Sequence, residues 1–216
     1  MVIPREVKKV VTHSRELRKL RESVALTAAQ RETVIGTMLG DGSLIPNSWG
    51  KSFRLHIEHG LQQKEYVFRK YRELKSFVLS RPTYFKRNHS WKFRTISHWD
   101  FTNLEHQFYG ASRRKMVSKE IVEALKSPKV IAIWYMDDGG IGKRQGKTYC
   151  AYFNSQSFSW AENEMLGKAL LELHGIETLI LRNHDLPRIY IPHLALTKLS
   201  DLVRPYIIPC MRYKIL

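Results

Sequence analysis

Residues 34–44 read VIGTMLGDGSL, and residues 131–141 read IAIWYMDDGGI. Each stretch is an apolar run that ends in an acid followed by glycine, and the two acids, Asp41 and Asp138, lie 97 positions apart. An apolar run that an Asp-Gly pair breaks is typical of a helix and its end. The sequence therefore predicts two corresponding helices, each with an acid at its C-terminal end.

Two further landmarks repeat in the same order. Residues 50–53 (GKSF) are matched by residues 146–149 (GKTY) at an offset of 96, and residues 87–89 (RNH) recur as residues 182–184 at an offset of 95. Three landmarks at nearly constant spacing indicate an internal repeat. We therefore expect two halves of about 95 residues each, related by an approximate two-fold axis.

Hydrophobic spacing assigns the other elements. Residues 53, 55 and 57 are apolar and alternate with polar ones, which is typical of a strand. The first half is also expected to hold helices over 30–39, 62–79 and 100–109 and hairpin strands over 83–86 and 91–96. The second half is expected to hold helices over 129–138, 159–174 and 193–203 and strands over 147–154, 176–182 and 188–191. The fold class is therefore α+β, with antiparallel sheets and helices packed on one face of each.

The pattern divides the chain into four segments. These are a basic N-terminal helix or arm (1–23), a first half (24–112), a linker (113–127) and a second half (128–216). The basic N-terminal segment fits either a solvated helix or arm, or additional contacts to phosphates. Because no stretch is rich in Pro or in Gly and Ser, we expect the halves to be pressed together rather than loosely tethered.

The charge balance indicates the class of partner. The 216 residues include 36 Lys and Arg against 20 Asp and Glu, a net charge of +16. Such an excess is usually neutralised by a polyanion, and nucleic acid is the leading candidate. The longest apolar run, residues 130–136, is too short to span a bilayer, and the N-terminus lacks the apolar region of a secretory signal. With only two cysteines, we expect an intracellular protein with reduced thiols, in an organelle matrix or a prokaryotic cytoplasm.

An acid at the end of each repeated helix favours a metal site. A carboxylate there faces the negative end of the helix dipole, which is unfavourable. If the two helices pack side by side, Asp41 and Asp138 come together beside unpaired carbonyl groups, and Mg²⁺ prefers such oxygen ligands. A single Asp-Gly would indicate only a turn, but the repeated spacing and the net charge favour the metal site. Gly36 and Gly40, one turn apart, indicate a close approach of the second helix.

These motifs resemble those of the LAGLIDADG homing endonucleases, in the single-chain group with two motifs. The stretches VIGTMLGDG and IAIWYMDDG align over nine family positions, with the essential acids at Asp41 and Asp138. The resemblance implies an αββαββα order in each half, saddle-shaped sheets that enter major grooves, and motif helices packed at the central two-fold axis. It also implies a monomer that acts as a pseudo-dimer and cuts both strands across the minor groove to leave short 3′ overhangs. A free-standing or intron-encoded form fits better than an intein.

The resemblance also implies the catalytic residues. Asp41 and Asp138 would bind two or more Mg²⁺ ions shared between the halves, with Mn²⁺ as a substitute, and carbonyl groups of Gly40 and Asp137 would assist. Active-site lysines fall at Lys115 and Lys214. The second motif departs from the family pattern at Ile133, where the family has Gly, and in carrying the additional acid Asp137.

Double-stranded DNA is the expected partner, read by the polar faces of the strands. In the first half this face holds Arg54, His56 and Glu58, and the repeat places Cys150, Tyr152 and Asn154 on the corresponding face, leaving Tyr149, Ala151 and Phe153 for the core. The remaining candidate DNA-binding residues are Lys86, Lys92, Arg94, Arg182, Arg188 and Tyr190. Two other functions stay open, an intron RNA maturase on the same scaffold and a catalytically inactive DNA-binding protein.

Overall fold

The computed structural model describes residues 14–109 and 114–216. Contacts within the chain divide it into two compact units. Unit 1 holds Asp41–Glu105 and the described part of Met1–Val34, and unit 2 holds Ile35–Gly40 and His106–Leu216. The residues Ile35–Gly40, at the C-terminal end of the first motif helix, therefore belong to unit 2.

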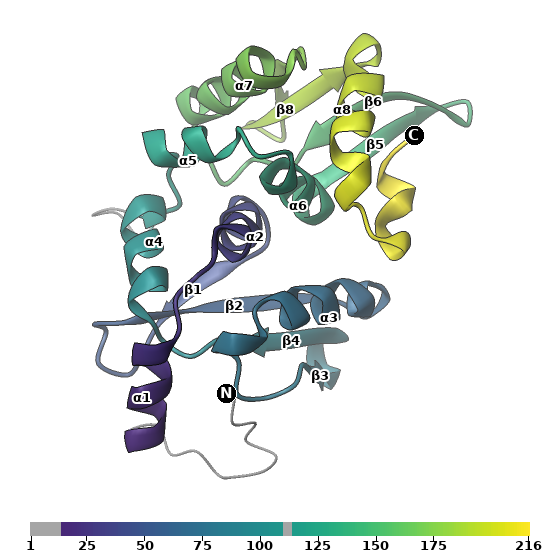
Figure 1. The fold of residues 1–216 in the computed structure, drawn as a ribbon. Helices are drawn as coiled ribbons and strands as arrows, with labels where there is room; N and C mark the ends of the chain where they lie inside the picture. Colours follow the sequence, from purple (N-terminus) through teal and green to yellow (C-terminus); the bar gives the residue numbers. More distant parts are fainter. Residues whose placement is uncertain (1–13, 110–113) are drawn as a thin grey trace. The chain divides into compact units, whose positions relative to one another are not determined.

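Unit 1 is built around an antiparallel sheet of four strands in the order β1-β2-β4-β3 (Figure 1). Its sheet side chains Leu55, Ile57 and Phe93 are buried, as are Tyr66 and Val67 of the covering helix α3. In chain order the elements are α1 (Arg15–Ser23), α2 (Ala28–Leu39), β1 (Ser43–Pro46), β2 (Phe53–Gly60), α3 (Lys64–Glu73), β3 (Thr83–Phe85), β4 (Ser90–Arg94) and α4 (Trp99–Tyr109).

Unit 2 repeats this arrangement with an antiparallel sheet in the order β5-β6-β8-β7. Its first long helix begins with Pro128 in the first turn, where the missing N–H costs nothing. A capping box between Ser159 and Glu162 starts α7, and Gly175, with φ of 63°, ends it. The elements are α5 (Lys119–Ala124), α6 (Pro128–Asp138), β5 (Gly139–Arg144), β6 (Lys147–Phe153), α7 (Trp160–His174), β7 (Leu179–Asn183), β8 (Leu186–Pro192) and α8 (Leu196–Val203).

The matching strand orders confirm the α+β class and the duplication. Several details differ from the predicted elements, among them the following. The strands β1 and β5, which follow the two motif acids, were not predicted from hydrophobic spacing. The strand β1 has only four residues and β5 contains three glycines, so neither shows a clear alternation of apolar and polar residues. The predicted helix 62–79 ends at Glu73 and is followed by a 3₁₀ turn at Lys75–Phe77. The predicted strand 176–182 begins only at Leu179.

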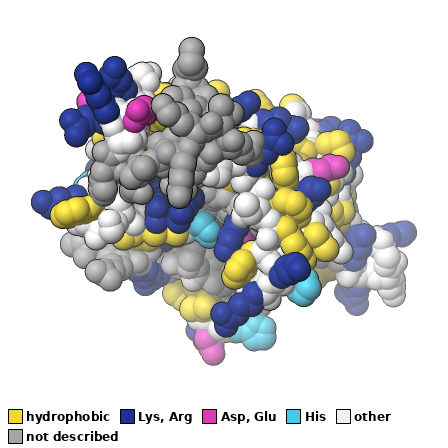
Figure 2. Space-filling model, turned by 90° about the horizontal axis from the view of Figure 1, so that it is seen from below, with side chains coloured by type: hydrophobic (Ala, Val, Ile, Leu, Met, Phe, Trp, Pro, Cys, Tyr) yellow, Lys and Arg dark blue, Asp and Glu magenta, His cyan; other side chains and the backbone are white. Residues whose placement is uncertain are grey.

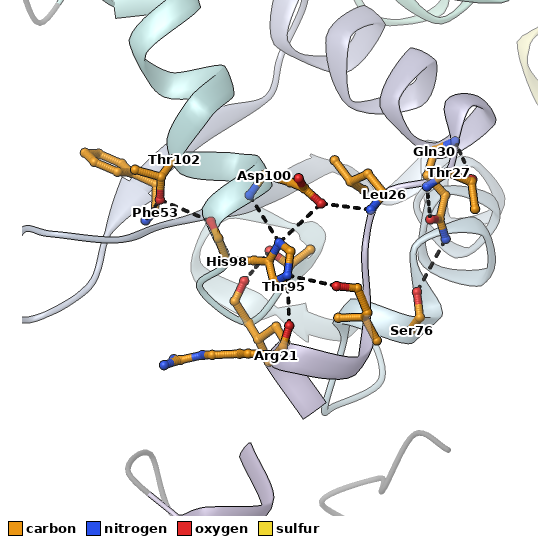
Figure 3. Close-up of polar contacts among 12 residues, drawn as sticks. Arg21, Leu26, Thr27, Gln30, Phe53, Ser76, Thr95, His98, Asp100 and Thr102 are labelled. Atoms are coloured by element: carbon orange, nitrogen blue, oxygen red, sulfur yellow. Dashed lines mark hydrogen bonds and ion pairs between the residues drawn. The ribbon is translucent and has the colours of Figure 1, made fainter. Parts of the chain in front are cut away.

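His98 and Asp100 fix the segment that joins α1 to α2 (Figure 3). The His98 Nε2 atom lies 3.1 Å from the carbonyl oxygens of both Arg21 and Val24. The Asp100 backbone N–H donates to His98 Nδ1 at 3.2 Å, so Nδ1 accepts and Nε2 carries the proton. The Asp100 carboxylate accepts from the Leu26 N–H at 2.8 Å. This network holds α1 against the rest of unit 1.

We predict that His98→Leu lowers the free energy of unfolding by about 1–3 kcal/mol, because two partly buried carbonyl groups lose their donor. Burial lowers the pKa of His98 below its usual value. Its contribution to stability is therefore present above about pH 6.5 and is lost as the pH falls below that value. Urea unfolding at pH 7.5 and 5.5 checks this, with the exposed His193→Leu as control. An equal pH dependence in wild type and His98→Leu would contradict the prediction.

Candidate functional site

The end of the first motif helix packs directly on α6, within unit 2. A Cβ atom added at Gly36 would lie 2.7 Å from the Val130 carbonyl oxygen and 2.8 Å from Ile133 Cβ. One added at Gly40 would overlap Asp137 Cβ. The expected close approach at the two glycines is therefore confirmed. Ile133 stands where the family pattern has glycine. Gly36 on the first motif helix has no side chain, and this leaves room for the Ile133 side chain on α6.

Two lysines bind the carbonyl groups at the ends of the motif helices. Lys115 Nζ donates to the Gly40 carbonyl at 2.7 Å. Lys214 Nζ, which is buried, donates to the carbonyl groups of Met136 at 2.6 Å and Asp137 at 3.0 Å. Helix-end carbonyl groups carry partial negative charge and lack partners within the helix. Each motif acid is therefore preceded by backbone carbonyl groups that a lysine binds.

The acids at the helix ends differ in burial. The Asp41 side chain is 46% exposed, and Asp138 is half-buried. Asp137 is buried at 7% exposure against Gly40. The Asp138 carbonyl accepts from the Asn154 N–H at 2.9 Å, which ties the second motif to the strand end of β6. Within unit 2, the more accessible acid of the pair is thus Asp138.

A row of polar contacts from Asp41 through His59 to Lys70, which we call the relay, supports Asp41 within unit 1. The Asp41 carboxylate lies 3.4 Å from His59 Nδ1, and Lys70 Nζ lies 3.2 Å from His59 Nε2. Lys70 is 1% exposed, and its ammonium lies 4.3 Å from the centre of the Tyr66 ring. An ammonium group only donates, so His59 accepts at Nε2 and directs the Nδ1 proton toward Asp41. Sequence reasoning missed this relay; the signal was a histidine at a core position of a strand.

The open face of the β1–β4 sheet gathers the predicted DNA-contacting residues of the first half other than Lys86. His56 pairs with Arg94 and Glu58 pairs with Lys92, so these side chains and Arg54 lie on one face, as predicted. Ser90 and Asn88 donate to the Glu58 carboxylate at 2.5 and 3.1 Å, and these bonds, led by that from Ser90, lower its pKa. We name this surface the first open face; its polar residues are Arg54, His56, Glu58, Lys92 and Arg94.

A hollow of about 500 Å³ at the first open face is lined by several cations, including Arg21 of α1, Arg54, Arg81 and Arg94. The Nε atoms of Arg21 and Arg54 are buried and have no hydrogen-bond partner in the described part of the chain. Burial lowers the pKa of both guanidinium groups, and the charge of Arg94 lowers that of Arg54 further. Buried guanidinium nitrogens without a hydrogen-bond partner, placed in a hollow, suit an anionic ligand. Figure 2 shows Lys and Arg side chains spread over the visible surface, with far fewer Asp and Glu among them.

In unit 2, Tyr152, Arg188 and Tyr190 share the open face of the β5–β8 sheet. Tyr152 pairs with Tyr190, and the Arg188 guanidinium carbon lies 4.4 Å from the centre of the Tyr152 ring. The predicted core position of Tyr149 is wrong, since Tyr149 is 45% exposed. The register shifts between Gly142, opposite Cys150, and Lys143, opposite Thr148, which leaves Tyr149 as the extra residue of a bulge.

Two further predicted contacts lie elsewhere. The Arg182 side chain is on the other side of its sheet from Arg188, because it alternates with Leu181, which pairs with Arg188. It forms an exposed ion pair of 2.8 Å with Asp185 and lies near the Trp160 ring. Lys86 is exposed in the 3₁₀ turn Lys86–Asn88 between β3 and β4. The structure therefore does not bring Arg182 together with the other candidates.

Comparison with known proteins agrees with the geometry. A family model described as the LAGLIDADG DNA endonuclease family matches residues 31–199, so the chain belongs to this family. It is 31% identical over 205 residues to a probable intron-encoded endonuclease of Wickerhamomyces canadensis, covering 91% of this chain and 87% of that protein. It is 28% identical over 213 residues to the DNA endonuclease I-ChuI of Chlamydomonas applanata, covering 89% and 96%.

A solved structure extends the comparison to the whole fold. The homing endonuclease I-WcaI, determined bound to its DNA recognition sequence, matches with a TM-score of 0.89 and 27% identity. The match covers 100% of this chain and 99% of that one. None of the helices in the described part of the chain is both long and apolar enough to cross a membrane.

Proposed function

We propose that this protein is a site-specific homing endonuclease that makes double-strand breaks in a long, pseudo-palindromic DNA target. The observation that carries the proposal is the pair of motif-helix ends, each with an acid and a lysine bound to its carbonyl groups. The family membership and the DNA-bound I-WcaI support it. The cationic hollow at the first open face supplies the means to bind a polyanion.

The donor atoms at the helix ends fit a hard divalent cation such as Mg²⁺. The accessible carboxylates are Asp41 and Asp138, and the Gly40 and Asp137 carbonyl oxygens each keep a second lone pair after accepting from a lysine. These four residues would hold two or more ions, with Mn²⁺ as a substitute. When bound, such ions stabilise charge on a phosphate and lower the pKa of an attacking water.

The other side chains would prepare the site. Lys115 and Lys214 place positive charge at the negative ends of two helix dipoles, where it offsets the repulsion between carboxylates and a phosphate. The Nδ1–H of His59 orients the Asp41 carboxylate, so that Asp41 meets its ligand in a fixed position. We propose hydrolysis of one phosphodiester bond in each strand, leaving short 3′ overhangs.

The experiment that tests the proposal is incubation of the full chain with a randomised duplex library, with Mg²⁺, Mn²⁺, Ca²⁺ or EDTA, followed by sequencing of both cut strands. We expect one preferred target, cut with Mg²⁺ or Mn²⁺, and bound but barely cut with Ca²⁺, which tolerates looser coordination. Cleavage in EDTA would contradict the metal mechanism. Displacement of the best duplex by an equal concentration of folded intron RNA would instead favour a maturase.

A separate prediction distinguishes base reading from phosphate binding on the first open face. Arg54→Ala should relax the preference at one or two neighbouring base pairs, because an arginine–guanine contact is worth about 1–3 kcal/mol of discrimination. Arg21→Ala, in the same hollow, should weaken binding to all sequences and reduce the salt dependence of binding. Cleavage of a library of single substitutions measures both. A uniform loss for Arg54→Ala would show that Arg54 binds phosphate.

A further inference from the structure

The open face of the β5–β8 sheet differs in chemistry from the first open face. Leu179 pairs with Tyr190 and Leu181 pairs with Arg188, so these four side chains lie together on the face that Tyr152 shares. The alternate residues Ile189 and Ile191 are buried. We name this surface the second open face; its residues are Tyr149, Tyr152, Leu179, Leu181, Leu186, Arg188 and Tyr190.

Its leucines are exposed although they lie on strands. Leu179 is 53% exposed, Leu181 40% and Leu186 50%. An apolar edge strand invites aggregation, and proteins usually place charge there. A cluster of exposed leucines on a protein with a high net charge therefore indicates a binding surface for a ligand that presents apolar groups.

No acidic residue accompanies these leucines on the strands of the sheet, since β5, β6, β7 and β8, all of them within the described residues, contain no Asp or Glu. The central cation, Arg188, lies over the Tyr152 ring. The phenols of Tyr149 and Tyr190 have raised pKa values, the first mainly through a hydrogen bond with Cys150 and the second mainly through burial, so both stay uncharged at neutral pH. By contrast, the named residues of the first open face are three Lys or Arg, one Glu and one His.

DNA offers one apolar feature to a strand in the major groove, the C5-methyl group of thymine. Positive charge at the tip of the β5–β6 hairpin, from Lys143, Arg144 and Lys147, could neutralise phosphates while the leucines meet base edges. Guanine, in contrast, is read by arginine. The exposed leucines therefore match a duplex rich in T·A pairs better than one rich in G·C pairs.

We propose that the second open face recognises a half-site rich in T·A pairs through thymine methyl groups, with Leu179 and Leu181 as the specificity-determining residues. The first open face, with its arginines, recognises the half-site that holds the G·C pairs. This inference rests on the proposed function, because it assumes that both open faces meet a DNA target.

Replacing thymine by deoxyuridine tests the inference, since it removes the methyl group and keeps base pairing. The target is first selected from the randomised library, and Arg54→Ala identifies the half-site of the first open face. We expect deoxyuridine in the other half-site to weaken binding roughly threefold for each contacted methyl group removed. The same replacement in the half-site of the first open face should leave affinity unchanged.

A double variant, Leu179→Ser with Leu181→Ser, supplies the second arm. It should lose the preference for thymine over deoxyuridine while it keeps binding to the half-site of the first open face. The control is Leu173→Ser, an exposed leucine on α7. Equal affinity for thymine and deoxyuridine targets in wild type would overturn the inference and leave the proposed function intact. A dimer in sedimentation that the double variant dissociates would mark the leucines as a self-association surface. A library that yields no bound duplex would overturn the proposed function and this inference together.

Discussion

Asp41→Asn and Asp138→Asn should each reduce double-strand cleavage by at least about 100-fold and change DNA affinity by less than about threefold. Asparagine keeps the shape of the side chain and removes the charge that would hold a divalent metal. Affinity is set mainly by cations, such as those that line the hollow at the first open face, and neither acid lines that hollow. Cleavage is measured under single-turnover conditions with Mg²⁺, and affinity with Ca²⁺.

The matched control is Asp201→Asn, an exposed residue of α8 in unit 2, whose carboxylate lies 3.9 Å from Arg204. It should cut at the rate of wild type, because an exposed ion pair contributes little. Wild-type cleavage by either motif variant would remove that acid from the mechanism. A variant that nicks one strand at the wild-type rate would show that each acid serves a single strand.

The parts of the fold that the sequence predicted are those that one strong local signal determines. The repeated motif and its glycines predicted two helices in close contact, and the structure has Gly36 and Gly40 against α6. The alternation of residues 53–58 predicted which side chains share a face, because a two-residue period leaves one assignment. Each of these signals is contained within one short stretch of sequence, or in the repeat of that stretch.

The parts that sequence could not predict depend on the partner strand. Tyr149 leaves the core only because β5 pairs with β6 through a bulge, which no pattern within β6 shows. The repeated Arg-Asn-His landmark also lies in different elements: Arg87 is in a 3₁₀ turn, whereas Arg182 is in β7 before a two-residue turn at His184 and Asp185. The same three residues therefore occupy a turn in one unit and the end of a strand in the other. The relay from Asp41 to Lys70 likewise depends on tertiary packing, because it forms only where α3, which carries Lys70, packs behind β2, which carries His59.

We expect Gly40→Ala to have the second large effect, because its methyl group would overlap Asp137 Cβ. Overpacking of this kind costs about 1–3 kcal/mol, and no helix propensity offsets it because Gly40 lies beyond the end of α2. Cleavage should fall further than the lost stability explains, because the neighbouring Asp41 and Asp138 would move with the helix ends. Urea unfolding and single-turnover cleavage measure the two effects on the same preparations.

Gly60→Ala is the matched control, since that glycine has φ of −59° and no atom within 4 Å of an added Cβ. It should leave both stability and cleavage close to wild type. The double variant Gly40→Ala with Asp137→Gly removes the Cβ atom that causes the overlap, so it should recover stability and part of the cleavage relative to Gly40→Ala alone. If the double variant is no better than the single one, contact between these two residues does not hold the helix ends in place. Recovery of stability without cleavage would instead show that the Asp137 carboxylate itself acts in the site.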